Sequence, residues 1–173
     1  IGADRDTRYV YSSVEKTISL IDDFLEAGYK PNEIMVLCRY DEGLSFLKSV
    51  KEKLRKKQIP FVGGKKDDKF VPKGHNKGDI NFVNVYSMHQ AKGREAKVVI
   101  LLHISSCIDG FRFPSEQTLD VELEPVVKKN IDQTEEERRL FYVSMTRAKE
   151  ELHILTRDNY ESPFISEVEQ YLD

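Results

Sequence analysis

Two segments of this 173-residue sequence gather side chains that could do chemistry. The first closes the partly alternating apolar stretch 80–88 and supplies a hydroxyl, an imidazole, an ammonium, a glycine and a carboxylate: Ser87, His89, Lys92, Gly93 and Glu95. The end of a strand is where ligands bind on open α/β sheets, and Gly93 would let the backbone approach a ligand closely. This pattern indicates a polar ligand site, although the same residues could form a plain turn.

The second segment, residues 136–149, has the spacing of an amphipathic helix and ends in the pair Thr146-Arg147 just before a strand. A guanidinium at that point could bind a phosphate group, because its planar fork matches phosphate oxygens. It could equally be a cation that satisfies the last carbonyl groups of the helix. The residues alone leave both interpretations open.

The sequence lacks the signatures of several other sites. The phosphate loop Gly-x-x-x-x-Gly-Lys-[Ser/Thr] is absent, since Gly64-Lys65 has Ile59 in place of the upstream glycine and Lys66 in place of the hydroxyl. Asp41-Glu42 is interpreted as a helix cap and not as a magnesium-binding pair. The four histidines and two cysteines show no metal-ligand spacing, so no metal site is predicted.

The elements that position these segments follow from the apolar periodicity. Helices are expected from an N-cap at Ser12 or Ser13 to Gly28, over 41–57, from a capping box at Thr134 to Ala148, and after Ser162-Pro163. Strands are expected over 34–38, 59–62, 80–88, 98–104 and 152–156, with a lysine-rich loop over 63–78 and an irregular stretch over 105–132. Strands that alternate with helices predict an α/β domain with a mainly parallel central sheet flanked by helices.

Composition and charge are those of a soluble chain that forms one domain over residues 1–173. No apolar run is long enough for a membrane span or a signal core, and the cysteine usage suits a reducing compartment, so a cytoplasmic location is expected. The net charge is −3, yet residues 48–79 carry +7 and residues 115–137 carry −6. The basic region could be a phosphate-binding surface or only a solvated helix face and loop.

The two chemistry-bearing segments, in this order, resemble motifs V and VI of the UvrD/Rep/PcrA-type superfamily 1 DNA helicases. The first follows Thr-x-His-x-Ala-Lys-Gly-Leu-Glu-Phe, and the second follows Glu-Glu-Arg-Arg-Leu-x-Tyr-Val-x-x-Thr-Arg-Ala from Glu136 to Ala148. Residues 34–39 are similar to the Ile-Ala-Val-Leu-x-Arg strand of the same domain. Ser87, Arg94 and Ala96 depart from the pattern, which has threonine, leucine and an aromatic residue there.

The resemblance implies a RecA-like fold, the second such domain (2A) of a longer helicase. The first RecA-like domain with motifs I to III is absent from the sequence, and so is the large 2B insertion. In such enzymes ATP with Mg²⁺ lies between the two domains, and the Mg²⁺ ligands would come from the missing N-terminal domain. On that analogy Arg147 would be the catalytic finger that reaches the γ-phosphate, Glu95 would bind the ribose, and Gly93 and Lys92 would shape the cleft.

The same resemblance implies that His89 and Ser87 contact single-stranded DNA in an ATP-dependent 3′ to 5′ helicase or translocase. Its partners would be single-stranded or duplex DNA and the N-terminal domain of the same protein, and replication, repair and plasmid DNA all stay open as substrates. The isolated chain would not hydrolyse ATP. The alternative is a RecA-like module that binds nucleic acid or protein without catalysis.

Overall fold

A six-stranded sheet stands between two layers of helices in the computed structural model, which describes residues 2–39, 46–65, 68–74, 80–106 and 124–172. The strands are β1 (Ile34–Cys38), β2 (Phe61–Gly63), β3 (Lys69–Phe70), β4 (Val83–Ser87), β5 (Ala96–Leu102) and β6 (Ala148–Ile154). Their order across the sheet is β3-β2-β4-β1-β5-β6, and every neighbouring pair is parallel except β2–β3 at one edge. The carboxyl ends of β4, β1, β5 and β6 therefore lie along the same side of the sheet, which is called the carboxyl edge below. Their amino ends lie along the opposite side, the amino edge.

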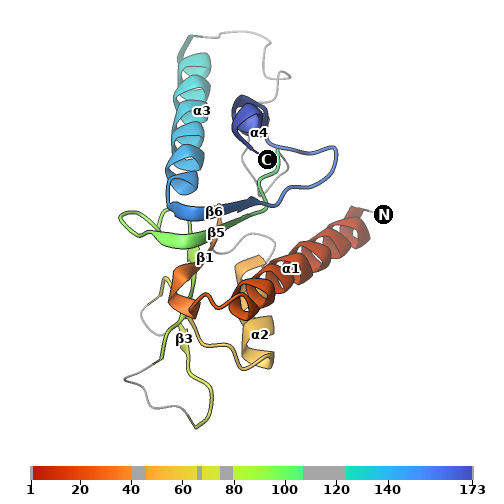
Figure 1. Cartoon of the computed structure of the whole chain (residues 1–173). Helices are drawn as coiled ribbons and strands as arrows, with labels where there is room; N and C mark the ends of the chain where they lie inside the picture. The colour runs from red at the N-terminus through yellow and green to blue at the C-terminus, as the bar shows by residue number, and fades with distance from the viewer. Residues whose placement is uncertain (1, 40–45, 66–67, 75–79, 107–123, 173) are drawn as a thin grey trace.

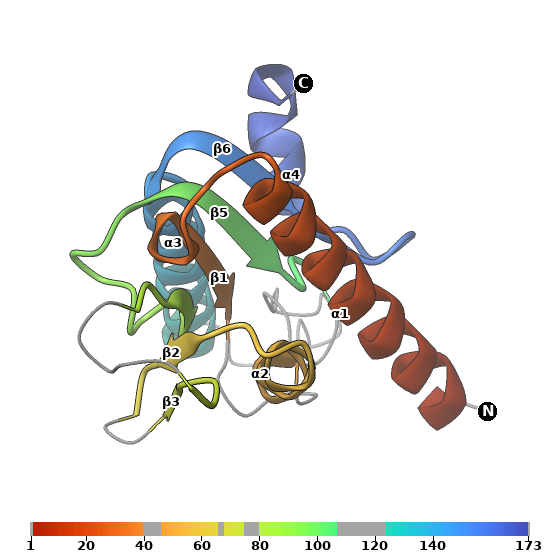
Figure 2. The same cartoon turned by 60° about the horizontal axis from the view of Figure 1, so that its bottom comes forward.

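Helices cover both faces of this sheet (Figures 1 and 2). They are α1 (Gly2–Glu26), α2 (Phe46–Lys56), α3 (Glu124–Met145) and α4 (Pro163–Val168), with short 3-10 turns at Pro31–Glu33 and Glu169–Tyr171. Helices α1 and α2 lie on one face and α3 and α4 on the other, so the core has two halves separated by the sheet. The expected α/β class with a mainly parallel, flanked sheet is confirmed.

The central strands are continuous apolar runs because both of their faces are covered. All five residues of β1 are buried. Ile34, Val36 and Cys38 pack with α1 and α2, whereas Met35 and Leu37 pack with α3 and α4. This alternation follows from the two-residue period of a strand.

Helix α1 begins at Gly2, so the expectation of an N-cap at Ser12 or Ser13 is wrong. The Ser12 hydroxyl donates to the Tyr9 carbonyl and the Thr17 hydroxyl donates to the Ser13 carbonyl, as hydroxyls do inside a helix. The expected end is confirmed: Gly28 has a φ of 95°, a backbone conformation that glycine adopts without strain.

Helix α3 also begins earlier than expected, at Glu124, so the capping box at Thr134 is wrong. Pro125 stands at the second helical position, where its missing N–H leaves no hydrogen bond unmade. The expected cap of α4 is confirmed, since the Ser162 hydroxyl accepts from the Phe164 N–H at 3.4 Å. The expected helix cap at Asp41 and most of the expected irregular stretch, residues 107–123, lie outside the described residues.

The strand boundaries differ where polar residues interrupt the apolar pattern. Strand β6 begins at Ala148 and not at 152, because Lys149, Glu150 and Glu151 stand on an edge strand whose side chains can remain in water. Strand β3 lies within the expected loop 63–78 and pairs antiparallel with β2, with the rings of Phe61 and Phe70 stacked 5.8 Å apart. A membrane-spanning helix is not found in the described part of the chain.

Candidate functional site

The segment from Ser87 to Glu95 runs from the carboxyl edge of the sheet to its amino edge. Strands β4 and β5 both run parallel to β1, so the chain leaves the carboxyl end of β4 and enters the amino end of β5. Ser87 and His89 therefore stand at the carboxyl edge, whereas Glu95 stands at the amino edge, next to β5. The expectation that these side chains share one end of a strand is wrong, because a parallel neighbour must be entered at its other end.

Arg147 lies at the amino edge, in the turn between α3 and β6. Its Nε donates to the Val143 carbonyl at 2.8 Å, which is one of the carbonyls left open at the end of α3. Its Nη1 donates to the Arg94 carbonyl at 3.3 Å and its Nη2 to the Thr146 hydroxyl at 3.3 Å. The guanidinium thus closes the end of α3 and ties it to the residue before Glu95.

Glu95, directly before β5, forms an ion pair at 2.7 Å with Lys149, near the start of β6. The hydrogen bond from Lys149 holds the pKa of Glu95 below its usual value, and the charges of Lys149 and then of Arg147 act in the same direction. Both side chains of the pair are more than half exposed. The carboxylate is therefore ionised, open to solvent and able to accept a further hydrogen bond.

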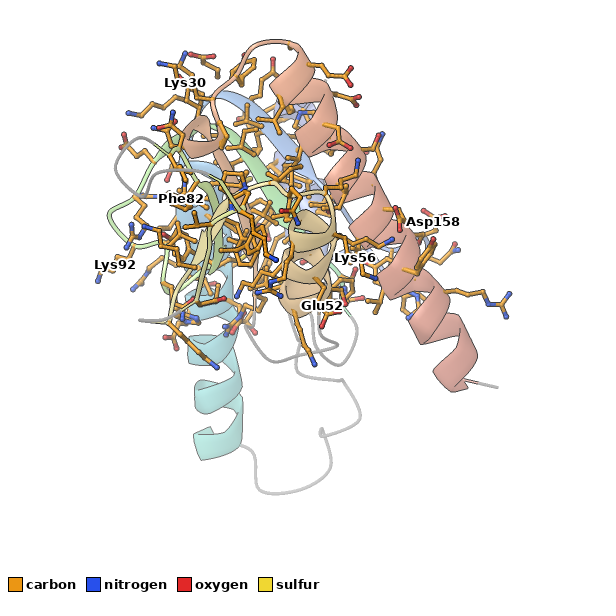
Figure 3. The ribbon with its side chains drawn as sticks, turned by 90° about the horizontal axis from the view of Figure 1, so that it is seen from below. Lys30, Glu52, Lys56, Phe82, Lys92 and Asp158 are labelled. Atoms are coloured by element: carbon orange, nitrogen blue, oxygen red, sulfur yellow. The ribbon has the colours of Figure 1, made fainter. Side chains whose placement is uncertain are left out.

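Gly93 and Lys92 form the exposed bend that leads to Glu95. Gly93 has a φ of 77°, and a Cβ placed there would meet no atom within 4 Å, so the backbone conformation and not a close approach requires glycine. Lys92 is exposed and lies at the side of the molecule opposite α1 (Figure 3). Arg94, where the helicase pattern has leucine, places its guanidinium 4.6 Å from the Tyr86 ring centre in a cation–π contact.

At the carboxyl edge, the residues after β4 wind into helical turns. The N–H groups of Gln90 and Ala91 donate to the Ser87 carbonyl at 3.0 and 3.2 Å, and the Met88 N–H donates to the Cys38 carbonyl at 2.9 Å. Ser87 is only 7% exposed, whereas His89 is exposed. Of the two residues expected to contact DNA, His89 is the accessible one.

His89 contacts a buried ion pair that the sequence analysis did not identify as functional. Arg39, directly after β1, donates from Nε to Glu137 Oε2 at 2.5 Å and from Nη2 to Glu137 Oε1, a two-pronged contact with α3. The two side chains are 9% and 8% exposed. Arg39 Nη1 lies 3.3 Å from His89 Nδ1. The signals in the sequence were an arginine that ends an apolar strand and a glutamate within the second motif, but the two are 98 residues apart.

Of the two adjacent arginines in the second motif, Arg138 and Arg139, Arg138 forms ion pairs with glutamates. It contacts Glu135, as expected for a helix pair three residues apart, and also Glu167 of α4 at 3.0 Å. Tyr142 donates from its hydroxyl to the same Glu167 at 3.1 Å. These contacts join α3 to α4 and so help to hold the helix that carries the second motif. Arg139 is exposed.

The basic region 48–79 is partly neutralised by acids. Lys53 pairs with Glu15 and Lys57 with Asp22, which joins α2 to α1, and Lys51 pairs with Asp68 at 2.5 Å. These lysines support packing, so the interpretation of the whole region as a phosphate-binding surface is not favoured. A groove of about 580 Å³ between α1 and the chain after β6 carries three cations and one acid: Arg8, Lys16, Arg157 and Asp158.

The described residues contain no group of three or more His, Cys, Asp or Glu side chains placed to hold a metal ion. The remaining chemistry of the site is that of two clusters. One, at the amino edge, presents a guanidinium and a carboxylate. The other, at the carboxyl edge, presents an imidazole supported by a buried ion pair.

Comparison with known proteins gives relatives that are all helicases by name. The chain is 34% identical to a probable DNA helicase II homolog of Mycoplasma capricolum over 103 residues, 54% of this chain and 12% of that protein. It is 32% identical to the ATP-dependent DNA helicase PcrA of Bacillus subtilis over 111 residues, 58% of this chain and 13% of that protein. It is 34% identical to DNA helicase IV of Escherichia coli over 84 residues, 48% of this chain and 12% of that protein. The matches thus span about an eighth of the length of these relatives.

The fold is similar to a solved structure, the C-terminal domain of a possible DNA helicase from Lactobacillus plantarum, with a TM-score of 0.51 and 15% identity over 89% of this chain and 71% of that one. Residues 70–159 match the family model described as the UvrD-like helicase C-terminal domain. That match covers just over half of the sequence and includes both motifs. The chain therefore belongs to the UvrD-like helicase C-terminal domain family.

Proposed function

We propose that this chain is the C-terminal motor domain of an ATP-dependent DNA helicase or translocase, which closes on ATP at an interdomain cleft and contacts single-stranded DNA. The observation that carries the proposal is the separation of the two motifs' polar groups. Arg147 and Glu95 lie together at the amino edge of the sheet, and the exposed His89 lies at the carboxyl edge. This arrangement supports separate places for nucleotide and DNA on one domain.

At the nucleotide, Arg147 would act as the finger. Its present acceptors are carbonyl and hydroxyl oxygens, which a γ-phosphate can replace with stronger charge-assisted hydrogen bonds. The guanidinium would stabilise the charge that spreads over the phosphate oxygens in the transition state. Glu95 would accept a hydrogen bond from the ribose hydroxyl, while Gly93 and Lys92 would shape that side of the cleft.

ATP with Mg²⁺ would be bound chiefly by another domain, an N-terminal RecA-like domain of the same protein. The sequence has no phosphate loop, so it lacks both the backbone cradle and the hydroxyl that contact the phosphates and Mg²⁺ in such domains. At the other edge, His89, with Ser87 behind it, would contact the single-stranded DNA backbone. Domain closure would then link the two sites through the sheet and α3.

The second candidate is a module that binds nucleic acid or protein without catalysis. One observation favours it: the guanidinium of Arg147 donates its hydrogen bonds to the Val143 carbonyl, the Arg94 carbonyl and the Thr146 hydroxyl, at the end of α3 and beside it, as a structural helix-end cation does. In that case Arg147 would never leave these acceptors.

The complete protein that contains this chain distinguishes the two candidates. DNA-stimulated ATP hydrolysis and strand unwinding are measured for the wild type, for Arg147→Ala and for Lys56→Ala, an exposed cation at the end of α2 that serves as the control (Figure 3). The proposal expects hydrolysis and unwinding in the wild type and in the control, and loss of both in Arg147→Ala. A wild-type protein that binds DNA but does not hydrolyse ATP would support the binding module instead.

A further inference from the structure

The imidazole of His89 is held by an arginine, and this contact determines which ring nitrogen carries the proton. A guanidinium has only N–H donors. Arg39 Nη1, 3.3 Å from His89 Nδ1, must therefore donate, and Nδ1 must accept with its lone pair. In the neutral ring the proton then lies on Nε2.

The arginine itself is fixed by two further bonds. Arg39 Nε and Nη2 bind the two carboxylate oxygens of Glu137, and the side chains of the pair are 9% and 8% exposed. A two-pronged contact of this kind fixes the plane of the guanidinium as well as its position. The remaining nitrogen, Nη1, is thereby directed at His89.

From this we propose that Arg39, oriented by Glu137, is a positioning residue that holds His89 as the Nε2–H tautomer and so makes Nε2–H the donor to a phosphate oxygen of single-stranded DNA. The DNA part of this inference rests on the proposed function. His89 is exposed whereas Arg39 is buried, so a ligand at the surface can reach the imidazole but not the ion pair.

The same contacts join three elements. Arg39 follows β1, His89 follows β4, and Glu137 belongs to α3, whose carboxyl end leads to Arg147. A shift of α3 that accompanies nucleotide binding would displace Glu137, and Arg39 with it. The ion pair is thus a physical link from the nucleotide end of α3 to the DNA-facing turn.

The tautomer of His89 is measured first, in the 173-residue chain without DNA. Nitrogen NMR of the labelled imidazole at about pH 8.5, well above the usual pKa of histidine, distinguishes a protonated from an unprotonated ring nitrogen. The wild type should show Nδ1 unprotonated and Nε2 protonated. The double variant Arg39→Met with Glu137→Met, which removes both buried charges, should show a mixture of tautomers.

Arg138→Met is the matched control, because it breaks an ion pair of the same helix away from His89 and should leave the tautomer unchanged. Thermal melts of each variant establish that it is folded. A proton on Nδ1 in the wild type would overturn the inference, and so would an unaltered tautomer in a folded double variant.

Binding of a fluorescent oligothymidylate then tests whether Nε2–H of His89 is the hydrogen-bond donor to DNA. The amide nitrogen of His89→Gln stands near the position of Nε2, and that of His89→Asn near Nδ1. His89→Gln keeps a donor near the position of Nε2, so it should bind about tenfold more tightly than His89→Asn, the difference expected for one hydrogen bond to a charged group. Equal affinities would overturn the donor role, whereas failure of every form to bind DNA, with the tautomer result intact, would contradict the proposed function and not the positioning of His89.

Discussion

At Arg147 the helix-end contacts and the proposed catalytic contact use the same three nitrogens. A finger must exchange the Val143 and Arg94 carbonyls for phosphate oxygens when the cleft closes. Because this exchange would be complete only in the closed transition-state complex, it would affect turnover more than ATP affinity.

We therefore predict that Arg147→Ala in the complete protein lowers kcat for ATP by on the order of 10³-fold with little change in KM. Arg147→Lys should restore little, since an ammonium keeps the charge but loses the planar fork. Steady-state kinetics, with thermal melts as the folding control, measure both. Turnover near that of the wild type in a folded Arg147→Ala protein would leave Arg147 as a helix-end cation.

Glu95 should behave differently, because the proposed ribose contact would form before the chemical step. Glu95→Ala is predicted to raise KM for ATP while kcat at saturation changes little. Steady-state kinetics of the complete protein measure kcat and KM for ATP separately. A fall in kcat at unchanged KM would assign Glu95 to the transition state instead.

The pKa of Glu95 offers a test that needs no nucleotide. Lys149 is the largest cause of its lowered value, so Lys149→Met should raise the pKa of Glu95 toward its usual value, with Arg147 still holding part of the shift. A carboxyl group whose pKa is lowered by folding stabilises the fold at pH values above its pKa in the unfolded chain. That stabilisation is lost as the pH falls through its pKa in the folded protein. Carbon NMR titration of the carboxyl group measures the change, and an unchanged pKa would contradict the 2.7 Å ion pair.

At the scale of elements, the buried Arg39–Glu137 pair joins β1 to α3. Removing one partner of a buried ion pair typically costs about 3–5 kcal/mol, whereas replacing both by apolar residues of similar size is often near neutral. Glu137→Ala should therefore lower the free energy of unfolding by several kcal/mol more than Arg39→Met with Glu137→Met does. Urea unfolding of the chain measures this, and equal losses would mean that the pair does not act as a unit.

The sequence predicts the elements whose pattern is local. The unbroken apolar run of β1, the glycine after α1 and the serine cap of α4 each depend on neighbouring residues, and all three are confirmed. The start of β6 was missed because its side chains are polar and its pairing with β5, Ala96 with Ala148, is long-range.

The sequence names the residues of the candidate site but does not predict their geometry. The motifs identified Arg147 and Glu95, yet their distance from Ser87 across the sheet follows from strand order, which no local pattern encodes. In the sequence, Arg39 stands at the end of the similar segment 34–39 and Glu137 stands within the second motif, and no local pattern joins them. Their pairing across 98 residues emerges only when β1 and α3 pack against each other.

For the whole molecule, the two-domain character of the proposed site has a direct consequence. The isolated chain should fold, because it has a core on both faces of its sheet, but it should not hydrolyse ATP. Its sequence lacks the phosphate loop, and a finger without that loop supplies no nucleotide site. Phosphate release in the presence of DNA is compared with that of Arg147→Ala, and turnover above this variant would contradict the prediction.

DNA binding by the isolated chain should be weak and strongly dependent on salt. Three of the lysines in the basic region already pair with acids, so their charge is partly neutralised and contributes less to phosphate binding. Each phosphate contact to a single strand contributes a slope of about −0.7 in log affinity against log salt, so three contacts would give about −2. Fluorescence anisotropy with an oligothymidylate over a salt series measures the slope. Tight binding that salt does not weaken would instead require bases stacked on aromatic rings, and would move the DNA site away from the turn after β4.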